Sequence, residues 1–77
     1  MVAKRPYAPI RASMAGQVAM ISAQTGDIVE EGESVVSVEA MKLMLDCEAP
    51  MRGEIEIMVS PHEMVVEDQV VAKIYPA

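Results

Sequence analysis

The sequence predicts an all-β barrel or sandwich built from two similar halves. Short runs of apolar and β-branched residues, separated by turn signals every eight or so residues, are typical of such folds. The pattern of the first half recurs about 36 residues later, which indicates a pseudo-two-fold axis. We see no window with apolar residues at i, i+3, i+4 and i+7 over ten or more residues, so we expect no helix.

We expect residues 1–9 to form an irregular leader or linker remnant, and residues 10–77 to form the folded domain. Pro6 and Pro9 bracket the dipeptide Tyr7-Ala8. Because proline fixes its own φ and removes a backbone donor, two prolines this close disfavour regular structure.

Each half is predicted to begin with a small-residue segment followed by a strand. Residues 12–16 (Ala-Ser-Met-Ala-Gly) precede a predicted strand at 17–21, and residues 49–53 (Ala-Pro-Met-Arg-Gly) precede another at 54–58. The spacing between the two copies is 37 residues. In the second copy Glu alternates with Ile, which is the period-two signature of a half-buried strand.

A second repeated segment supplies a turn and the start of a further strand. Residues 26–35 match residues 62–71 at a spacing of 36. Where the first copy has Gly26 and Gly32, the second has His62 and Asp68. Glycine adopts positive φ at no steric cost, and Asp and His tolerate it better than most residues. We therefore expect the second-half turns either to persist with some strain or to be remodelled.

Between the halves, a single lysine separates two short apolar runs. Residues 35–38 and 43–45 favour strands, so Lys42 is predicted at the tip of a tight hairpin. Neither Gly nor Pro marks the bend, so local turn chemistry alone would not predict it. Cys47 continues the strand alternation beyond Leu45 and is predicted to be a small core residue.

Composition narrows the classes of function. The 77 residues carry a net charge of −6 with a pI near 4.5, which argues against binding to nucleic acid or anionic lipid. No stretch approaches the roughly 18 apolar residues of a membrane span, and the N-terminal residues lack the apolar core of a secretory signal. One cysteine cannot form an internal disulfide, so we expect a cytoplasmic location or an organelle matrix. The core is expected to consist of Val, Ile, Leu and Met, with the eight methionines as adaptable fillers.

The residues around Lys42 carry a resemblance to a known family. The run Glu39-Ala40-Met41-Lys42-Leu43 resembles the Glu-Ala-Met-Lys-Met attachment sequence of biotinyl domains, with Leu43 where Met is usual. Together with the two-half pattern, it makes residues 10–74 similar to the biotinyl/lipoyl domain family, and most similar to biotin carboxyl carrier proteins.

This resemblance implies a fold, a cofactor and partners. The fold would be a flattened β-barrel of two four-stranded antiparallel sheets, with the modified lysine at one end and both termini at the other. Lys42 would be biotinylated by a biotin protein ligase, with Glu39, Ala40, Met41 and Leu43 as flanking recognition positions. The covalent biotin would carry CO2 as carboxybiotin from a biotin carboxylase to a carboxyltransferase.

The residues themselves favour a substrate over a catalyst. A solvated lysine amine is mostly protonated at neutral pH, and Glu39 and Asp46 would stabilise its charged form. The sequence offers no Ser-His-Asp or Cys-His set and no phosphate-binding glycine loop, and His62 has no Cys or second His as a partner. We therefore predict no catalytic residue and no metal site.

Two alternatives remain open. A lipoyl-type acyl carrier shares the fold, but its lysine usually follows Asp and precedes Ala, where this chain has Met41 and Leu43. An unmodified structural β-sandwich, like those in membrane-fusion adaptors of efflux pumps, lacks the modified lysine. An intact mass without an adduct after expression with a ligase would favour that second alternative.

Overall fold

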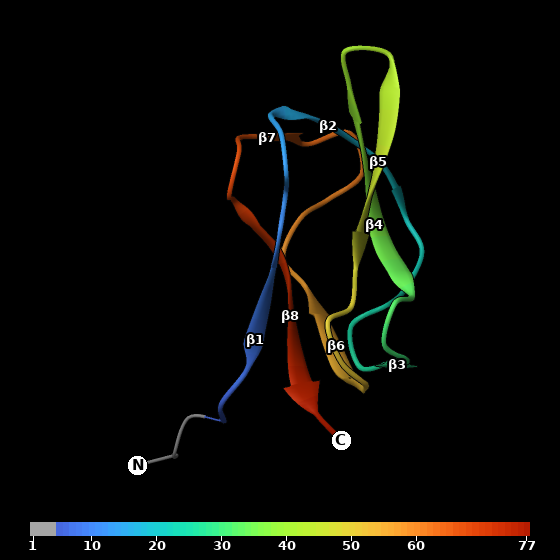
Figure 1. Ribbon diagram of the computed structural model, residues 1–77, viewed down its shortest axis with the longest axis vertical. Helices are drawn as coiled ribbons and strands as arrows, with labels where there is room; N and C mark the ends of the chain where they lie inside the picture. Colours follow the sequence, from blue (N-terminus) through green and yellow to red (C-terminus); the bar gives the residue numbers. More distant parts are fainter. Residues whose placement is uncertain (1–4) are drawn as a thin grey trace.

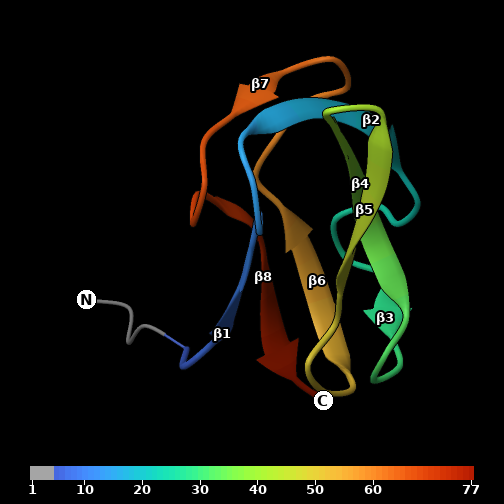
Figure 2. The ribbon, with the colours of Figure 1, turned by 45° about the horizontal axis from the view of Figure 1, so that its top comes forward.

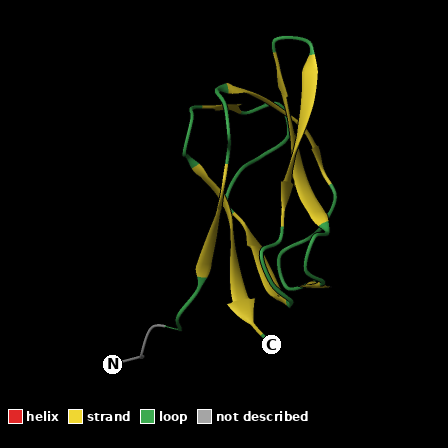
Figure 3. Ribbon diagram, in the orientation of Figure 1, coloured by secondary structure: helices red, strands yellow, loops and turns green. Residues whose placement is uncertain are grey.

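The computed structural model describes residues 5–77 as two four-stranded antiparallel sheets, and no helix occurs within that range. The sheets enclose a flattened barrel (Figures 1 and 3), which confirms the predicted fold class. One sheet has the order β1-β8-β6-β3 and the other β5-β4-β2-β7. The strands are β1 (Ala8–Arg11), β2 (Gly16–Ile21), β3 (Ile28–Val29), β4 (Ser34–Ala40), β5 (Leu43–Glu48), β6 (Gly53–Ile57), β7 (Met64–Val65) and β8 (Val70–Pro76).

The sequence repeat relates one sheet to the other. The shift of 36 or 37 residues that matches the halves turns the order β5-β4-β2-β7 into β1-β8-β6-β3. Backbone hydrogen bonds repeat accordingly: the Ala12 amide donates to the Gln69 carbonyl at 2.9 Å, and the Ala49 amide donates to Glu33 at 2.9 Å. The predicted pseudo-two-fold axis is thus present in the backbone.

Strand β1 begins inside the segment that we expected to be an irregular leader. Residues 1–4 of that leader lie outside the described residues, but Ala8 and Pro9 belong to β1, and Pro9 pairs with Lys73. Because β1 is an edge strand that pairs only with β8, a proline can turn its missing N–H toward solvent without breaking a ladder. The first strand therefore starts two residues before the expected boundary at residue 10.

The core is built from small and β-branched residues, and here the sequence prediction was wrong about methionine. Its largest fully buried side chains are Ile55, Ile74, Val18, Val29, Val35, Val36, Val38 and Val71. Among the described methionines, Met51 packs partly against this core, whereas the other six are exposed. Packed sheets lie only about 10 Å apart, and β-branched side chains fill that gap well, so a thin barrel leaves little interior space for long, unbranched ones.

The turns of the second half persist without glycine. His62 has φ 70° and Asp68 has φ 69°, and their counterparts Gly26 and Gly32 have φ 99° and 84°. The turn backbone bonds persist as well: the His62 amide donates to the Val18 carbonyl at 2.9 Å, as Gly26 does to Ile55 at 2.8 Å. These backbone hydrogen bonds hold each turn against its sheet. The backbone of His62 and Asp68 therefore keeps the left-handed conformation although both residues carry side chains.

The molecule is elongated, with principal extents of 42 × 26 × 17 Å. The tip of the β4–β5 hairpin lies at one end of the long axis, while the C-terminus and the start of β1 lie at the other (Figure 1). The lysine therefore lies opposite the C-terminus and the first strand, as the family resemblance implied.

Candidate modification site at the hairpin tip

The tip is a two-residue turn whose backbone is unfavourable for its side chains. Strands β4 and β5 remain paired up to Ala40 and Leu43, which leaves only Met41 and Lys42 in the loop. Met41 has φ 50° and Lys42 has φ 67°. Positive φ at both central positions is the requirement of a type I′ turn, normally met by Asn or Gly. Local turn signals missed this bend because Met-Lys is not such a pair.

The tip stands clear of the barrel. Met41 is 83% exposed, Leu43 is 59% exposed, and Lys42 is exposed between them. Figure 1 shows the hairpin extending beyond the neighbouring strands of its sheet. The Lys42 amine is therefore accessible to an enzyme that approaches along the long axis.

Packing and one polar contact hold the stem of the hairpin. Val36, Val38 and Ala40 of β4 are buried. On the opposite face, the Ser37 hydroxyl donates to Asp46 Oδ1 at 2.9 Å across the strand pair. A cross-strand hydrogen bond of this kind fixes the pairing register, and with it which residues occupy the two-residue turn.

The flanking positions predicted for recognition do not share one environment. Glu39, Met41 and Leu43 are exposed, whereas Ala40 is only 3% exposed. Glu39 pairs with Met44 on the outer face of the sheet, and Ala40 pairs with Leu43 on the other face. Any contribution of Ala40 to recognition therefore acts through packing of the stem.

Asp46 lies further down the stem than Lys42. Asp46 pairs with Ser37, three residues down the strand from the Ala40–Leu43 pair, which corresponds to about 10 Å. Its carboxylate is engaged by the Ser37 hydroxyl. In residues 5–77 the ion pairs are Arg5–Glu54 and Arg52–Glu30, so neither involves Lys42.

The other polar or reactive residues that the sequence singled out lie elsewhere. Cys47 is 6% exposed in the core, and burial, with a smaller effect of Asp46, raises the pKa of its thiol. His62 lies in the turn before β7. Within residues 5–77 no three His, Cys, Asp or Glu side chains are grouped to hold a metal, and no helix is long and apolar enough to cross a membrane.

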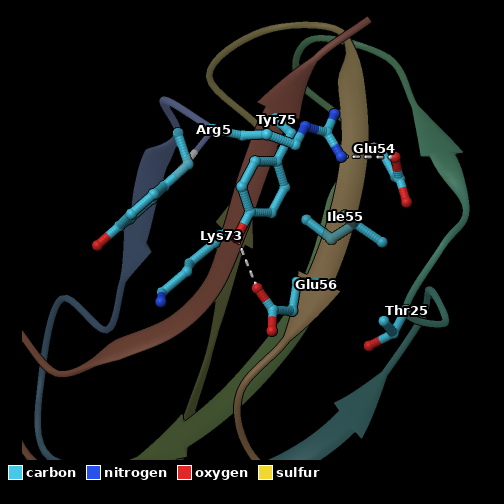
Figure 4. Close-up of a pocket in the computed structure, with 8 residues that line it drawn as sticks. Arg5, Thr25, Glu54, Ile55, Glu56, Lys73 and Tyr75 are labelled. Atoms are coloured by element: carbon cyan, nitrogen blue, oxygen red, sulfur yellow. Dashed lines mark hydrogen bonds and ion pairs between the residues drawn. The ribbon is translucent and has the colours of Figure 1, made fainter. Parts of the chain in front are cut away.

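A hollow of about 500 Å³ lies on the outer face of the other sheet (Figure 4). Its charged groups already have partners: Arg5 pairs with Glu54 at 3.3 Å, and the Tyr75 hydroxyl donates to Glu56 at 2.8 Å. The hydrogen bond to Glu56 raises the pKa of Tyr75. The sequence offered no signal for this cluster, because Arg5 and Tyr7 fall in the segment read as a leader.

Fold and tip together define a class of protein. A two-fold-repeated β-barrel that displays one lysine on the hairpin between its halves is the architecture of biotinyl and lipoyl domains. The chain belongs to the family described as "Biotin-requiring enzyme", whose model matches residues 8–74.

Solved structures agree with that membership. The chain is similar to part of a single-chain, multi-domain long-chain acyl-CoA carboxylase, with 26% identity and a TM-score of 0.82 over 100% of this chain and 8% of that one. It is also similar to part of the Kluyveromyces lactis urea carboxylase, with 27% identity and a TM-score of 0.86 over 96% of this chain and 7% of that one. The chain thus spans less than a tenth of either carboxylase and is a biotin carboxyl carrier-like domain.

Proposed function

We propose that this domain is a biotin carboxyl carrier, biotinylated on Lys42 by a biotin protein ligase. The observation that carries the proposal is the accessible amine on a two-residue turn that projects beyond the barrel. An amide would form between the biotin carboxyl carbon and Lys42 Nζ, as Nζ loses a proton and the group activating the carboxyl leaves. The residues present fit this group, because a primary amine in solvent is all that the linkage requires of the chain.

The chain itself acts as a substrate in this proposal. No described ion pair or hydrogen bond engages the Lys42 amine, so the ligase has to activate the carboxyl and accept the proton. When bound, biotin supplies a ring nitrogen that accepts and releases CO2. The lysine stem and the biotin chain together reach on the order of 15 Å. Tethering raises the effective concentration of the carried group at each active site that the arm can reach.

The partners follow from the same role. The two similar proteins are an acyl-CoA carboxylase and a urea carboxylase. We propose that Lys42 visits a biotin carboxylase site and a carboxyltransferase site, supplied by the same polypeptide or by other subunits. The position of the tip suits movement between two active sites. The hairpin presents its lysine away from the C-terminus and the start of β1, where a connection to a larger assembly would run (Figure 1).

The test is intact mass spectrometry after incubation with purified biotin protein ligase, Mg-ATP and biotin. We expect one biotinyl group on the wild-type chain and none on Lys42→Arg, since arginine cannot be acylated in this way. A parallel reaction with a lipoate ligase and lipoate tests the lipoyl alternative. Modification at Lys4 or Lys73 would contradict the assignment to Lys42, and absence of any adduct would favour an unmodified structural module.

A further inference from the structure

The outer faces of the two sheets carry different side chains, although the repeat makes their strand positions equivalent. On the outer face of the sheet that carries Lys42, strand pairing aligns one row across four strands: Met44, Glu39, Gln17 and Met64. The equivalent row of the other sheet contains Tyr75, Glu54 and Ile28, with Tyr7 just before β1. The repeat therefore offers an internal comparison between two surfaces of the same backbone shape.

On the outer face of the β1-β8-β6-β3 sheet, charged and aromatic side chains contact one another. The Arg5 guanidinium lies 4.6 Å from the centre of the Tyr75 ring and forms an ion pair with Glu54. The Lys73 ammonium lies 4.6 Å from the centre of the Tyr7 ring. Figure 4 shows Arg5 and Lys73 reaching over this face, whose charged and aromatic groups satisfy one another.

The outer face of the sheet that carries Lys42 exposes long apolar side chains. Met20, Met44 and Met64 are 59%, 57% and 69% exposed, and we call these three residues the methionine face. Met44 and Met64 lie three strand spacings apart, or about 14 Å. Flexible, polarisable methionine side chains adapt to a partner surface and recur at binding sites.

The methionine face is continuous with the hairpin tip. Met44 follows Lys42 by two residues on β5, and β7 with the start of β2 lies at the tip end of the molecule (Figures 1 and 2). Met41, in the turn between Ala40 and Leu43, adds a further exposed apolar side chain beside the lysine. An enzyme that encloses the tip in its active site therefore meets this face next.

The charge of this sheet further restricts the kind of partner that can bind it. The four strands of this sheet contain three charged residues, Glu39, Asp46 and Glu48, and all three are acidic. Glu39 lies within the row, between Met44 and Gln17. A second copy of this chain would bring acidic residues against acidic residues in a two-fold contact, which is unfavourable. A partner surface with an apolar patch and Lys or Arg around it would be complementary to the methionine face.

We propose that the methionine face is the docking surface for the ligase that acylates Lys42, and that this ligase meets it with an apolar patch bordered by basic residues. The inference rests on the proposed function, since it names a further contact of the enzyme that modifies the tip. Docking here would hold the hairpin in register with the ligase active site. It would also let the ligase distinguish this sheet from the other one, whose outer charged and aromatic groups contact one another.

The test measures initial rates of biotinylation against the concentration of the acceptor domain. The double substitution Met20→Ser with Met64→Ser leaves the tip intact, and we expect it to raise KM about tenfold or more, with kcat within about twofold. Ile28→Ser is the matched control, because Ile28 is exposed at the position equivalent to Met64 on the other sheet. It should leave KM unchanged. Met64→Leu should retain the parent KM.

A second arm tests the charge. Glu39→Gln should raise KM and reduce the dependence of kcat/KM on salt, because a steering charge has been removed. Glu31→Gln, which removes an exposed charge from the turn before β4, serves as the control.

The outcomes distinguish failure of the docking surface from failure of the proposed function. A wild-type chain that accepts biotin, together with a double variant of unchanged KM, would overturn this inference and leave the proposed function standing. An equal effect of Ile28→Ser would show that any exposed apolar side chain matters. A concentration-dependent dimer that the methionine substitutions abolish would assign the face to a second copy. A wild-type chain that takes no biotin would overturn the proposed function itself.

Discussion

Lys42 owes its position to the backbone around it. Its neighbours on the chain supply two strands with a fixed register, and the turn that joins them has positive φ at both residues. Holding an ordinary side chain in the left-handed region costs roughly 1–2 kcal/mol per residue. The stem compensates through burial of Val36 and Val38 and through the Ser37–Asp46 hydrogen bond. The strain is thus confined to the two residues that face solvent.

Because Lys42 is exposed, its side chain should matter little to stability. We expect Lys42→Ala to change the free energy of unfolding by no more than about 0.5 kcal/mol. Val38→Ala, at a side chain only 1% exposed, should cost roughly 1–3 kcal/mol. Urea denaturation of the three proteins measures the difference. If Lys42→Ala were the less stable variant, the lysine would be a structural residue.

Burial of Cys47 predicts a defined pH dependence. Since burial raises the pKa of its thiol in the folded state, the protonated form is favoured by folding. That contribution is complete below the unfolded pKa of about 8.5 and is lost as the pH rises through the folded value, so stability should decline in that alkaline range. Cys47→Ala should remove this part of the decline in urea melts from pH 7 to pH 10. Fast reaction of the native thiol with Ellman's reagent at pH 8 would contradict the buried position.

The hairpin is the element in which specificity for one modifying enzyme is expected to lie. Met41 and Leu43 present two exposed apolar groups at the bend. Burying them in a ligase pocket, at about 25 cal/mol per Å², would favour binding by a few kcal/mol. The same groups would obstruct a lipoate ligase suited to Asp and Ala, because specificity is a difference of affinities.

Exchange of these two residues should therefore change the choice of enzyme. Leu43→Met is expected to biotinylate as fast as the parent or slightly faster, because the two side chains have similar volumes. Met41→Asp with Leu43→Ala should slow biotinylation strongly and begin to admit lipoylation. Initial rates with both purified ligases measure the effect. A double variant biotinylated at the parent rate would place recognition away from the tip.

At the scale of the molecule, one backbone plan is used twice with different side chains. Gly16 and Gly53 occupy equivalent sites where a Cβ would collide with the backbone carbonyls of Glu39 and Tyr75. These close approaches bring β2 against β4 and β6 against β8. The halves thus share the contacts that shape the barrel and differ in what they show to solvent.

The shared plan predicts equal responses in the two halves. Gly16→Ala and Gly53→Ala should each destabilise the domain by about 1–3 kcal/mol, because the added methyl group forces the strands apart. Thermal or urea melts of both variants provide the comparison. A large cost at one site with none at the other would mean that the repeat does not extend to the packing of these strands.

From the sequence alone one can predict the strand pattern, the two-fold repeat and the place of Lys42 between the halves. These features are encoded locally: alternation has a period of two, and repeated segments carry repeated turn and packing needs. Tertiary structure decided the rest. Pro9 could enter β1 only because that strand lies at a sheet edge. The Met41-Lys42 turn depends on the pairing of β4 with β5 rather than on turn residues. Six of the seven methionines within residues 5–77 are exposed because a thin barrel is filled by Val and Ile, and the interior volume is a property of the assembled sheets.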